Sequence, residues 1–189
     1  MFLPGASGNT QFWRPVGARL QHPGARHFLA WPGLGGVPPE PGVSGITDLV
    51  ARVVREITGP VALLAQSMGG VIAVRATLEK PDRVRHLVLS VTSGGIDVAS
   101  LGAQDWRPTF GADHPGRPSW FVSEREDLTE RMREIAIPVL LLWGNADPIS
   151  PVAVGRRLAE LVVVEGGTHN LVWERVDEVV WHIDRHLAT

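Results

Sequence analysis

The sequence predicts a three-layer α/β/α fold built on a mostly parallel sheet of six strands. Short, uniformly apolar runs alternate with helix-like segments, and small or polar residues gather just after several of the runs. A strand in a parallel sheet is covered on both faces, so its sequence is apolar throughout instead of alternating. The 189 residues suffice for one substantial core, and we expect a single domain over residues 1–189.

The expected strands are short runs rich in apolar or β-branched residues. They lie at residues 1–3, 27–30, 61–65, 84–91, 139–143 and 161–164. The segments between them carry apolar residues at helical spacing. One expected helix ends near residue 20. The others lie at residues 46–57, 69–80, 124–135, 152–158 and 171–187. Ser44 or Thr47 is the expected cap of the second helix, and Pro81 stops the third.

Residues 92–123 form the longest stretch without a regular period. They consist largely of Gly, Pro, Asp and isolated aromatic residues, a composition typical of loops. We expect them to form a short, irregular cap that encloses a ligand only in part.

The composition argues against several functions. The formal net charge of −2 and the scattered basic residues give no support for a nucleic-acid partner. The chain has no cysteine, which excludes disulfides, thiolate metal sites and a cysteine nucleophile. The sequence shows neither a signal-like start nor an apolar run of about 18 residues. We therefore expect a soluble, cytoplasmic protein without a membrane partner, a cofactor or a metal.

Ser67 follows the apolar run at residues 61–65 and precedes a helix-like stretch. A sharp strand-to-helix turn lifts a serine hydroxyl clear of the sheet, and only small residues fit around it. Ala65 and Gly69 stand two residues before and after Ser67, and Gly70 follows. Ala65 departs mildly from the glycine that is usual there. Ser67 is a candidate nucleophile, although the motif alone is equally typical of a simple connection.

Two further polar residues follow later strands. Asp147 comes after the fifth expected strand and His169 after the sixth. Ligand sites of open parallel sheets lie beyond the carboxyl ends of the strands, so we expect both side chains to lie near Ser67. A serine nucleophile needs an adjacent base, and a carboxylate fixes the tautomer of that base. Asp97, after the fourth expected strand, is an alternative acid.

The chain order serine, acid, histidine, each after a strand, resembles the α/β-hydrolase superfamily over nearly the whole chain. The resemblance implies a catalytic triad of Ser67, Asp147 and His169. It also implies an oxyanion hole formed by the backbone N–H groups of Ala6 and Met68. Larger members have two more strands before the oxyanion loop and a helical lid, so this chain resembles an abbreviated member with a short cap.

The resemblance also implies a strand order. In chain numbering the order is 2, 1, 3, 4, 5, 6, which leaves the strand at residues 27–30, from His27 to Ala30, at an edge. An exposed edge invites pairing with another chain. A homodimer through this edge is therefore a hypothesis.

Several aromatic residues are expected near the mouth of the site. Phe12, Trp13, Trp106 and Trp120 either wall an apolar substrate pocket or anchor loops by packing, and the sequence favours neither reading. The cap arginines are more typical of solvated side chains than of carboxylate ligands; they are Arg107, Arg117 and Arg125.

His182 and His186 are four residues apart on the last expected helix, a spacing that metal ligands can use. Without an evident third ligand, a solvated helix face is the favoured interpretation. Residues 5–10 have neither the Gly, Lys, Ser/Thr ending of a P-loop nor the three-glycine spacing of a dinucleotide-binding fold, so nucleotide binding is not expected.

The leading functional hypothesis is a serine hydrolase that cleaves an ester or thioester of a small, largely apolar acyl group through an acyl-enzyme on Ser67. One alternative is a cofactor-free lyase or carbon–carbon bond hydrolase that uses the same three residues for proton transfer. A third is a binding protein without catalysis, which would gain nothing from an aligned triad. In each case we expect a small-molecule partner whose identity depends on the shape of the pocket.

Overall fold

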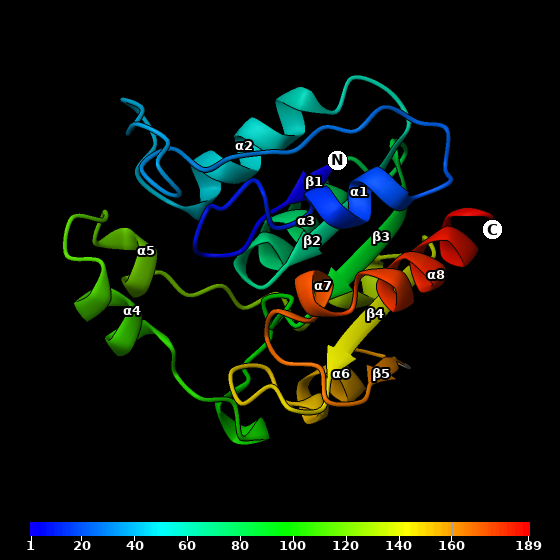
Figure 1. Cartoon of the computed structure of the whole chain (residues 1–189). Helices are drawn as coiled ribbons and strands as arrows, with labels where there is room; N and C mark the ends of the chain where they lie inside the picture. Colours follow the sequence, from blue (N-terminus) through cyan, green and yellow to red (C-terminus); the bar gives the residue numbers. More distant parts are fainter. Residues whose placement is uncertain (160) are drawn as a thin grey trace.

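Five parallel strands form one sheet in the computed structural model, which describes residues 1–159 and 161–189. Their spatial order is also their chain order. They are β1 (Phe2–Leu3), β2 (Val61–Gln66), β3 (Val84–Ser90), β4 (Val139–Gly144) and β5 (Val162–Val164). Every neighbouring pair is parallel. The predicted α/β class is confirmed, and Figure 1 shows the strands side by side with helices around them.

The second expected strand, at residues 27–30, is wrong. In its place Phe28 makes one isolated parallel bridge to Phe2. The Phe2 N–H donates to the His27 carbonyl (2.7 Å) and the Leu29 N–H donates to the Phe2 carbonyl (2.9 Å). Because β1 has only two residues, it is too short for the segment at residues 27–30 to pair with it as a regular strand. The edge is shorter than the sequence suggested, and the homodimer stays a prediction.

Helices cover both faces of the sheet (Figure 1). On one face α3 packs on β2 and β3, with α2 beside it, and on the other α8 packs on β3 and β4, with α1 beside it. The expected helix at residues 171–187 is interrupted at Arg175, so it becomes two. The helices of the two layers are α1 (Arg14–Arg19), α2 (Ile46–Glu56), α3 (Met68–Glu79), α6 (Val152–Leu158), α7 (Leu171–Glu174) and α8 (Val176–Leu187).

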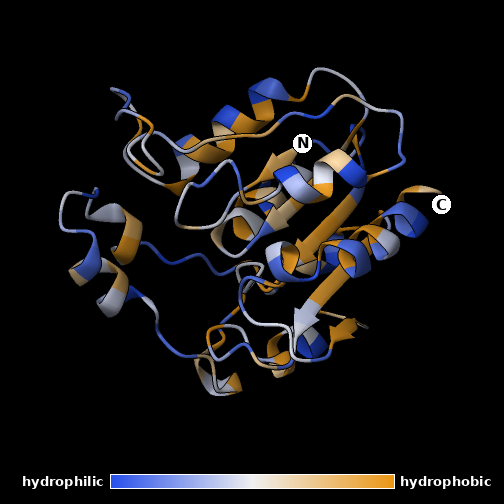
Figure 2. Cartoon of the chain, viewed as in Figure 1, coloured by the Kyte–Doolittle hydropathy of each residue, from blue (hydrophilic) through white to orange (hydrophobic). Residues whose placement is uncertain are grey.

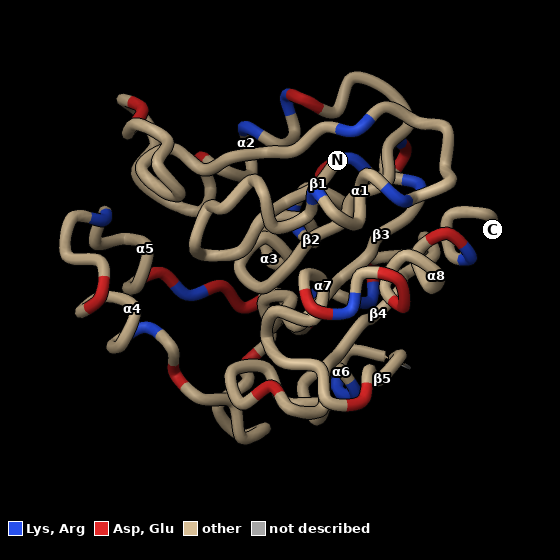
Figure 3. The backbone as a smooth tube through the Cα atoms, viewed as in Figure 1, with Lys and Arg blue, Asp and Glu red and all other residues tan. Residues whose placement is uncertain are grey.

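The interior is apolar along the whole sheet. Figure 2 shows hydrophobic residues concentrated in the strands and on the inner sides of the helices. Apart from Arg85 on β3, the strands carry no Asp, Glu, Lys or Arg, and Figure 3 shows the charges on helices and loops instead. This distribution is what a sheet covered on both faces requires.

Two buried tryptophans anchor the segment that follows β1. The Trp13 indole N–H donates to the Leu3 carbonyl (3.1 Å), and the Trp31 indole N–H donates to the Pro4 carbonyl (3.0 Å). Trp13 is 1% exposed and Trp31 is fully buried. Of the two readings that the sequence leaves open for Trp13, pocket wall and packing anchor, the pocket wall is wrong, because the side chain belongs to the core. Its contribution is to hold the loop that begins at Pro4.

The cap is more regular than the sequence suggested. Residues 92–123 contain η1 (Ala99–Leu101), α4 (Arg107–Asp113) and α5 (Trp120–Ser123). The ring of Phe110 stacks on that of Phe121, with centroids 5.5 Å apart, and so joins α4 to α5. Sequence periodicity did not indicate these helices, because each is too short to show a repeat.

The expected helix at residues 124–135 is wrong. Only a 3₁₀ turn, η2 (Arg131–Glu134), forms there. The Leu128 N–H donates to the Gly95 carbonyl (2.8 Å), and the Asp127 carboxylate accepts the Thr129 N–H (3.1 Å). Both bonds use backbone donors that a helix would need for itself.

The start of α2 also differs from the expected caps. Gly45 is its N-cap residue and makes no side-chain cap. Ser44 instead donates its hydroxyl to the Asp48 carboxylate (3.0 Å). The Ile46 N–H donates to the Glu124 carboxylate (2.6 Å), which comes from the segment after the cap. The helix is thus capped by a residue that is distant in sequence.

Among the helices of the described residues, none has the length and apolar character that crossing a bilayer requires.

Candidate active site

Ser67 occupies a strained turn between β2 and α3. Its φ of 53° lies in the left-handed region that non-glycine residues rarely adopt. The Ser67 N–H donates to the Ser90 carbonyl (3.0 Å), and the Ser67 carbonyl accepts the Gly70 N–H (2.9 Å) and the Thr92 hydroxyl (2.6 Å). A Cβ at Gly69 would stand 2.5 Å from the Pro4 carbonyl oxygen. Small residues are thus needed beside Ser67, as the sequence predicted.

The loops after β4 and β5 are joined to each other. The Ala146 N–H donates to the Gly167 carbonyl (2.9 Å), and the Gly166 N–H donates to the Asn145 side-chain oxygen (2.7 Å). A Cβ at Gly144 would lie 2.0 Å from the Gly167 oxygen, so the two backbones touch only because residue 144 is glycine. This contact fixes the distance between the residues that follow in each loop.

Ser67, His169 and Asp147 form a continuous hydrogen-bonded chain. His169 Nε2 lies 3.1 Å from Ser67 Oγ, and His169 Nδ1 lies 2.8 Å from Asp147 Oδ2. With the proton on Nδ1, the imidazole donates to the carboxylate and its Nε2 is free to accept from the serine. The structure therefore brings together the three side chains that the sequence expected to meet.

The Asp147 carboxylate is fully buried, whereas the His169 side chain is 19% exposed. The other oxygen of Asp147, Oδ1, accepts the N–H groups of Ile149 (2.8 Å) and Ser150 (3.1 Å). These three bonds satisfy a buried charge that would otherwise be costly. The alternative acid, Asp97, is exposed and accepts the Ala99 N–H (3.1 Å) instead.

Ala6 and Met68 flank Ser67. Within the described residues, no acceptor forms a hydrogen bond with either backbone N–H. Gly5 precedes Ala6, and a Cβ there would stand 2.2 Å from the Gln66 side-chain oxygen and 3.1 Å from Ser67 Cβ. Glycine at this position lets the loop after β1 approach the serine closely.

Two hollows adjoin Ser67 and His169. One, of about 410 Å³, includes Ala6, Phe12 and Phe110 in its wall, and the other, of about 480 Å³, includes Met68. Trp106 lines both hollows. Phe12 and Trp106 thus lie where the sequence expected pocket residues.

Trp120 lines neither of these hollows. Its ring packs against that of Phe121, with centroids 5.4 Å apart. Of the two readings that the sequence leaves open for Trp120, the pocket wall is wrong, and the side chain packs within the cap.

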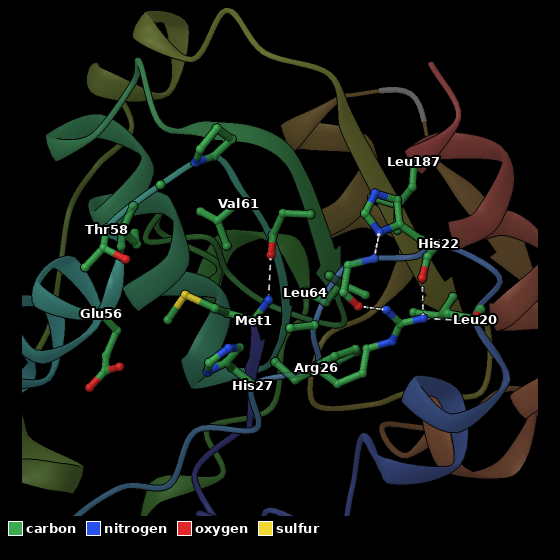
Figure 4. Close-up of a pocket in the computed structure, with 17 residues that line it drawn as sticks. Met1, Leu20, His22, Arg26, His27, Glu56, Thr58, Val61, Leu64 and Leu187 are labelled. Carbon is green, nitrogen blue, oxygen red and sulfur yellow. Dashed lines mark hydrogen bonds between the residues drawn. The ribbon is translucent and has the colours of Figure 1, made fainter.

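A third cavity, of about 310 Å³, lies at the opposite end of the sheet (Figure 4). Arg26 reaches into this region and donates to the carbonyls of Gly17 (3.2 Å) and Leu20 (2.9 Å). The guanidinium therefore holds the chain after α1 in place. No member of the Ser67, His169, Asp147 chain lines this cavity.

Two residues that support the site were missed by the sequence analysis. Thr92 bonds the Ser67 carbonyl, and the Gln66 amide donates to the His169 carbonyl (3.2 Å). Both are buried. Neither belongs to a local pattern, because their partners are 25 and 103 positions away. Only the fold brings them together.

This combination of a parallel sheet, a strained serine after one strand and a histidine–carboxylate pair after two others defines the α/β-hydrolase class. A family model described as "Alpha/beta hydrolase family" matches residues 1–131, a segment that contains Ser67. That match covers more than half of the chain. The protein therefore belongs to the alpha/beta hydrolase family and is an enzyme of the hydrolase class.

Individual relatives are more distant. A 2-hydroxy-6-oxononadienedioate/2-hydroxy-6-oxononatrienedioate hydrolase of Klebsiella pneumoniae is 26% identical and aligns with 92% of this chain and 80% of its own. A pimeloyl-[acyl-carrier protein] methyl ester esterase of Legionella pneumophila is 24% identical over 76% of this chain and 73% of its own.

Solved structures show the same fold. A thermophilic esterase from Thermogutta terrifontis superposes with a TM-score of 0.77 at 21% identity, covering 99% of this chain and 88% of the esterase. A hydrolase from Pseudomonas aeruginosa gives a TM-score of 0.76 at 18% identity, covering 100% of this chain and 89% of the other. At these identities the likeness concerns the fold.

Proposed function

We propose that the protein is a serine hydrolase that cleaves an ester or thioester of a small, largely apolar acyl group through an acyl-enzyme on Ser67. The observation that carries the proposal is the hydrogen-bonded chain from Ser67 through His169 to Asp147. A serine, a base and an orienting carboxylate in this arrangement are what nucleophilic catalysis on a carbonyl requires.

In this mechanism His169 Nε2 takes the proton of Ser67 as its oxygen attacks the carbonyl carbon. Asp147 orients the imidazole and stabilises the imidazolium that forms. His169 then gives the proton to the leaving alcohol or thiol as its bond to the acyl carbon breaks. His169 then takes a proton from water, whose oxygen attacks the acyl carbon of the acyl-enzyme. The bond between that carbon and Ser67 Oγ breaks, His169 returns the proton to Oγ, and the acid is released.

The backbone N–H groups of Ala6 and Met68 stabilise the negative charge on the tetrahedral intermediate by hydrogen bonding to its oxygen. Their lack of another hydrogen-bond partner in the described structure supports this role. One such donor is worth about 3 kcal/mol of transition-state stabilisation. The strain at Ser67 is in keeping with the role, since strained backbone is concentrated at functional sites.

An ester with an apolar group suits the hollow that contains Phe12 and Phe110 in its wall. The methyl ester esterase among the relatives supports ester chemistry. A small-molecule acyl substrate is thus the proposed partner.

A covalent label tests the nucleophile. We expect a fluorophosphonate probe to label the folded protein once, at Ser67, and to fail on Ser67→Ala. A folded Ser67→Ala protein that is labelled as strongly as the wild type would contradict the proposal. Hydrolysis of p-nitrophenyl esters by the wild type, lost in Ser67→Ala, would establish the reaction class.

The Klebsiella relative, whose name gives a dioate substrate, favours carbon–carbon bond hydrolysis as a second candidate. In that case Arg107 and Arg125 would bind substrate carboxylates. Both already have protein partners: Arg107 pairs with Asp105 (3.0 Å), and Arg125 donates to the Val122 carbonyl (2.8 Å). We therefore favour the ester. Normal probe labelling with inactivity on every ester would reverse this preference.

The cytoplasmic location and the independence from cofactors stay predictions from the sequence. Fractionation of cells that produce the protein would test the first, and activity after exhaustive dialysis against a chelator would test the second.

A further inference from the structure

The space around Ser67 is divided into two hollows with different walls. The aromatic hollow is the cavity of about 410 Å³ whose wall includes Phe12, Thr109 and Phe110. The polar hollow is the cavity of about 480 Å³ whose wall contains Arg107, Arg125 and five carboxylates. Both contain Ser67 and His169, so a carbonyl held at Ser67 has an open space on each side.

Trp106 stands at the boundary between the hollows. Among the described residues, six line both hollows, namely Ser67, Gln104, Asp105, Trp106, Ile149 and His169. Trp106 has the largest side chain of this shared set, and it lies outside the hydrogen-bonded chain at Ser67. Its indole therefore limits how far a group in one hollow can extend into the other.

Trp106 packs against two neighbours within the cap. Its ring meets Phe110 edge-on at 5.3 Å between centroids, and the Arg107 guanidinium lies 5.2 Å from the ring centroid. The Gln104 N–H, two residues earlier, donates to the Pro148 carbonyl (3.0 Å), next to Asp147. The wall formed by Trp106 is thus tied to the loop that carries the proposed catalytic acid.

Carboxylates outnumber guanidinium groups in the walls of both hollows. Arg107 and Arg125 line the polar hollow together with five carboxylates, those of Asp97, Asp105, Glu124, Glu126 and Asp127, of which Glu126 is also paired with Arg75 (2.8 Å). Asp105 and Asp113 line the aromatic hollow, and neither Lys nor Arg is among its described lining residues. A cleft with an excess of one sign repels ligands of that sign. An uncharged group is therefore accepted in either hollow more readily than a carboxylate of the same size.

We propose that Trp106 is a specificity-determining residue that assigns the two substituents of an ester to separate hollows. The substrate class is an ester with an apolar group on one side of the carbonyl and a polar, uncharged group on the other. This inference rests on the proposed serine hydrolase activity. It adds that the lengths of the two groups are limited independently and that Trp106 sets one of the limits.

Two series of esters test the proposal. In the first the acyl chain lengthens with a constant alcohol, and in the second the alcohol lengthens with a constant acetyl group. For the wild type we expect kcat/KM to fall beyond a certain length. In Trp106→Ala we expect the longest members of one series to gain about tenfold or more, while the shortest change by less than about twofold. For Trp106→Phe, which keeps a smaller ring, we expect kcat/KM values on the longest esters between those of the wild type and of Trp106→Ala.

Trp120→Ala is the matched control, because it removes the same side chain from the cap without opening either hollow. We expect it to leave the length profile unchanged. Near-ultraviolet circular dichroism and thermal unfolding show whether each variant keeps its cap. A folded Trp106→Ala enzyme with the wild-type profile in both series, or with the profile of Trp120→Ala, would overturn the role of Trp106.

A terminal carboxylate tests the charge argument. For a matched pair of esters in either series, one ending in a methyl group and the other in a carboxylate, we expect the methyl-ended ester to have the higher kcat/KM, and the difference to shrink as salt is added. Equal rates or a preference for the carboxylate would overturn this part. If the wild type showed neither probe labelling nor hydrolysis of any ester, that result would instead contradict the proposed function.

Discussion

Thr92 connects the strand next to β2 with the strained turn at Ser67. Its hydroxyl donates to the Ser67 carbonyl (2.6 Å) and accepts the Gly94 N–H (3.1 Å), and the residue is 1% exposed. Gly70 leaves room for this contact, since a Cβ there would lie 2.4 Å from the Thr92 hydroxyl. The bond holds the backbone whose conformation aims the Ser67 hydroxyl at His169.

We expect Thr92→Val, which keeps the shape of the side chain, to lower kcat by about tenfold with little change in KM. The nucleophile is misaligned in the transition state, whereas the polar hollow, which Thr92 also lines, keeps its shape because valine and threonine have the same shape. Thr92→Ser restores the hydroxyl and should recover most of the rate. Steady-state kinetics on a p-nitrophenyl ester measure both parameters.

Thr77→Val is the control for Thr92→Val. The Thr77 hydroxyl is also buried and donates to the Ala73 carbonyl (2.8 Å), but within α3. Both changes remove one buried hydrogen bond, worth about 1 kcal/mol. If Thr77→Val lowered kcat as much as Thr92→Val, general destabilisation would explain the loss and the positioning role would fail.

At this scale the sequence predicted residues that follow strands and missed those that support them. Ser67, Asp147 and His169 were found because parallel strands bring their carboxyl ends together, a rule that needs no distances. Thr92 depends on how closely two neighbouring strand ends approach. For Trp13 the sequence could not decide between the two readings, because the same pattern is expected of an aromatic residue that faces the core and of one that faces the ligand.

The start of α2 depends on a residue outside its own segment. The Glu124 carboxylate accepts the Ile46 N–H (2.6 Å), where the helix dipole favours a negative charge. Gly45 permits this approach, because a Cβ there would stand 2.3 Å from a Glu124 oxygen. Glu124 also lines the polar hollow, so the contact joins α2 to the segment that leaves the cap.

We expect Glu124→Ala to lower the free energy of unfolding by about 1 kcal/mol, as the loss of a helix cap does. Gly45→Ala should have a similar cost because its methyl group displaces the carboxylate. Since both changes break the same contact, the double variant should be less destabilised than the sum of the single variants. Urea unfolding measures all three.

Glu134→Ala provides the comparison for Glu124→Ala. Glu134 forms an exposed ion pair with Arg131 (3.2 Å), which contributes little to stability. A cost for Glu124→Ala no larger than that of Glu134→Ala, or strict additivity with Gly45→Ala, would show that the cap is unimportant.

Helices whose apolar residues recur at helical spacing were predicted well. Segments whose conformation depends on contacts with residues distant in sequence were not. The predicted helix that became α2 has a clear apolar stripe, with Ile46, Leu49, Val50 and Val53 buried. The helix expected at residues 124–135 gave way because Leu128 bonds to Gly95 and Asp127 closes a local turn. Neither competing bond is visible as a pattern in the sequence.

At the scale of the whole molecule, the amino ends of the strands carry a group of histidines far from Ser67. The rings of His86 on β3 and His186 on α8 meet edge-on, with centroids 5.2 Å apart. Burial lowers the pKa of His186 to about 4, and the charge of His86 adds to this effect, whereas a hydrogen bond with the Leu87 backbone opposes it. Burial and the charge of His22 also lower the pKa of His86.

These shifts make the stability of the fold depend on pH. An unfolded histidine takes up a proton near pH 6.5, but folded His186 resists protonation until about pH 4. The stabilisation is therefore complete above the unfolded pKa, declines as the pH falls through the window between these values, and is constant below it. Because the ring is partly exposed, solvent screening reduces the effect to about 1 to 2 kcal/mol.

We expect His186→Gln to become more stable relative to the wild type as the pH is lowered from 7 to 5, because its side chain has no proton to take up on unfolding. The free energy difference between the two proteins, measured by urea unfolding at each pH, cancels the other titrating groups. His182→Gln, one turn away on α8, should show a smaller change, since Glu178 partly offsets the lowering of the pKa of His182 by burial. A difference for His186→Gln that does not vary over this range would mean that His186 titrates alike in the folded and unfolded chains.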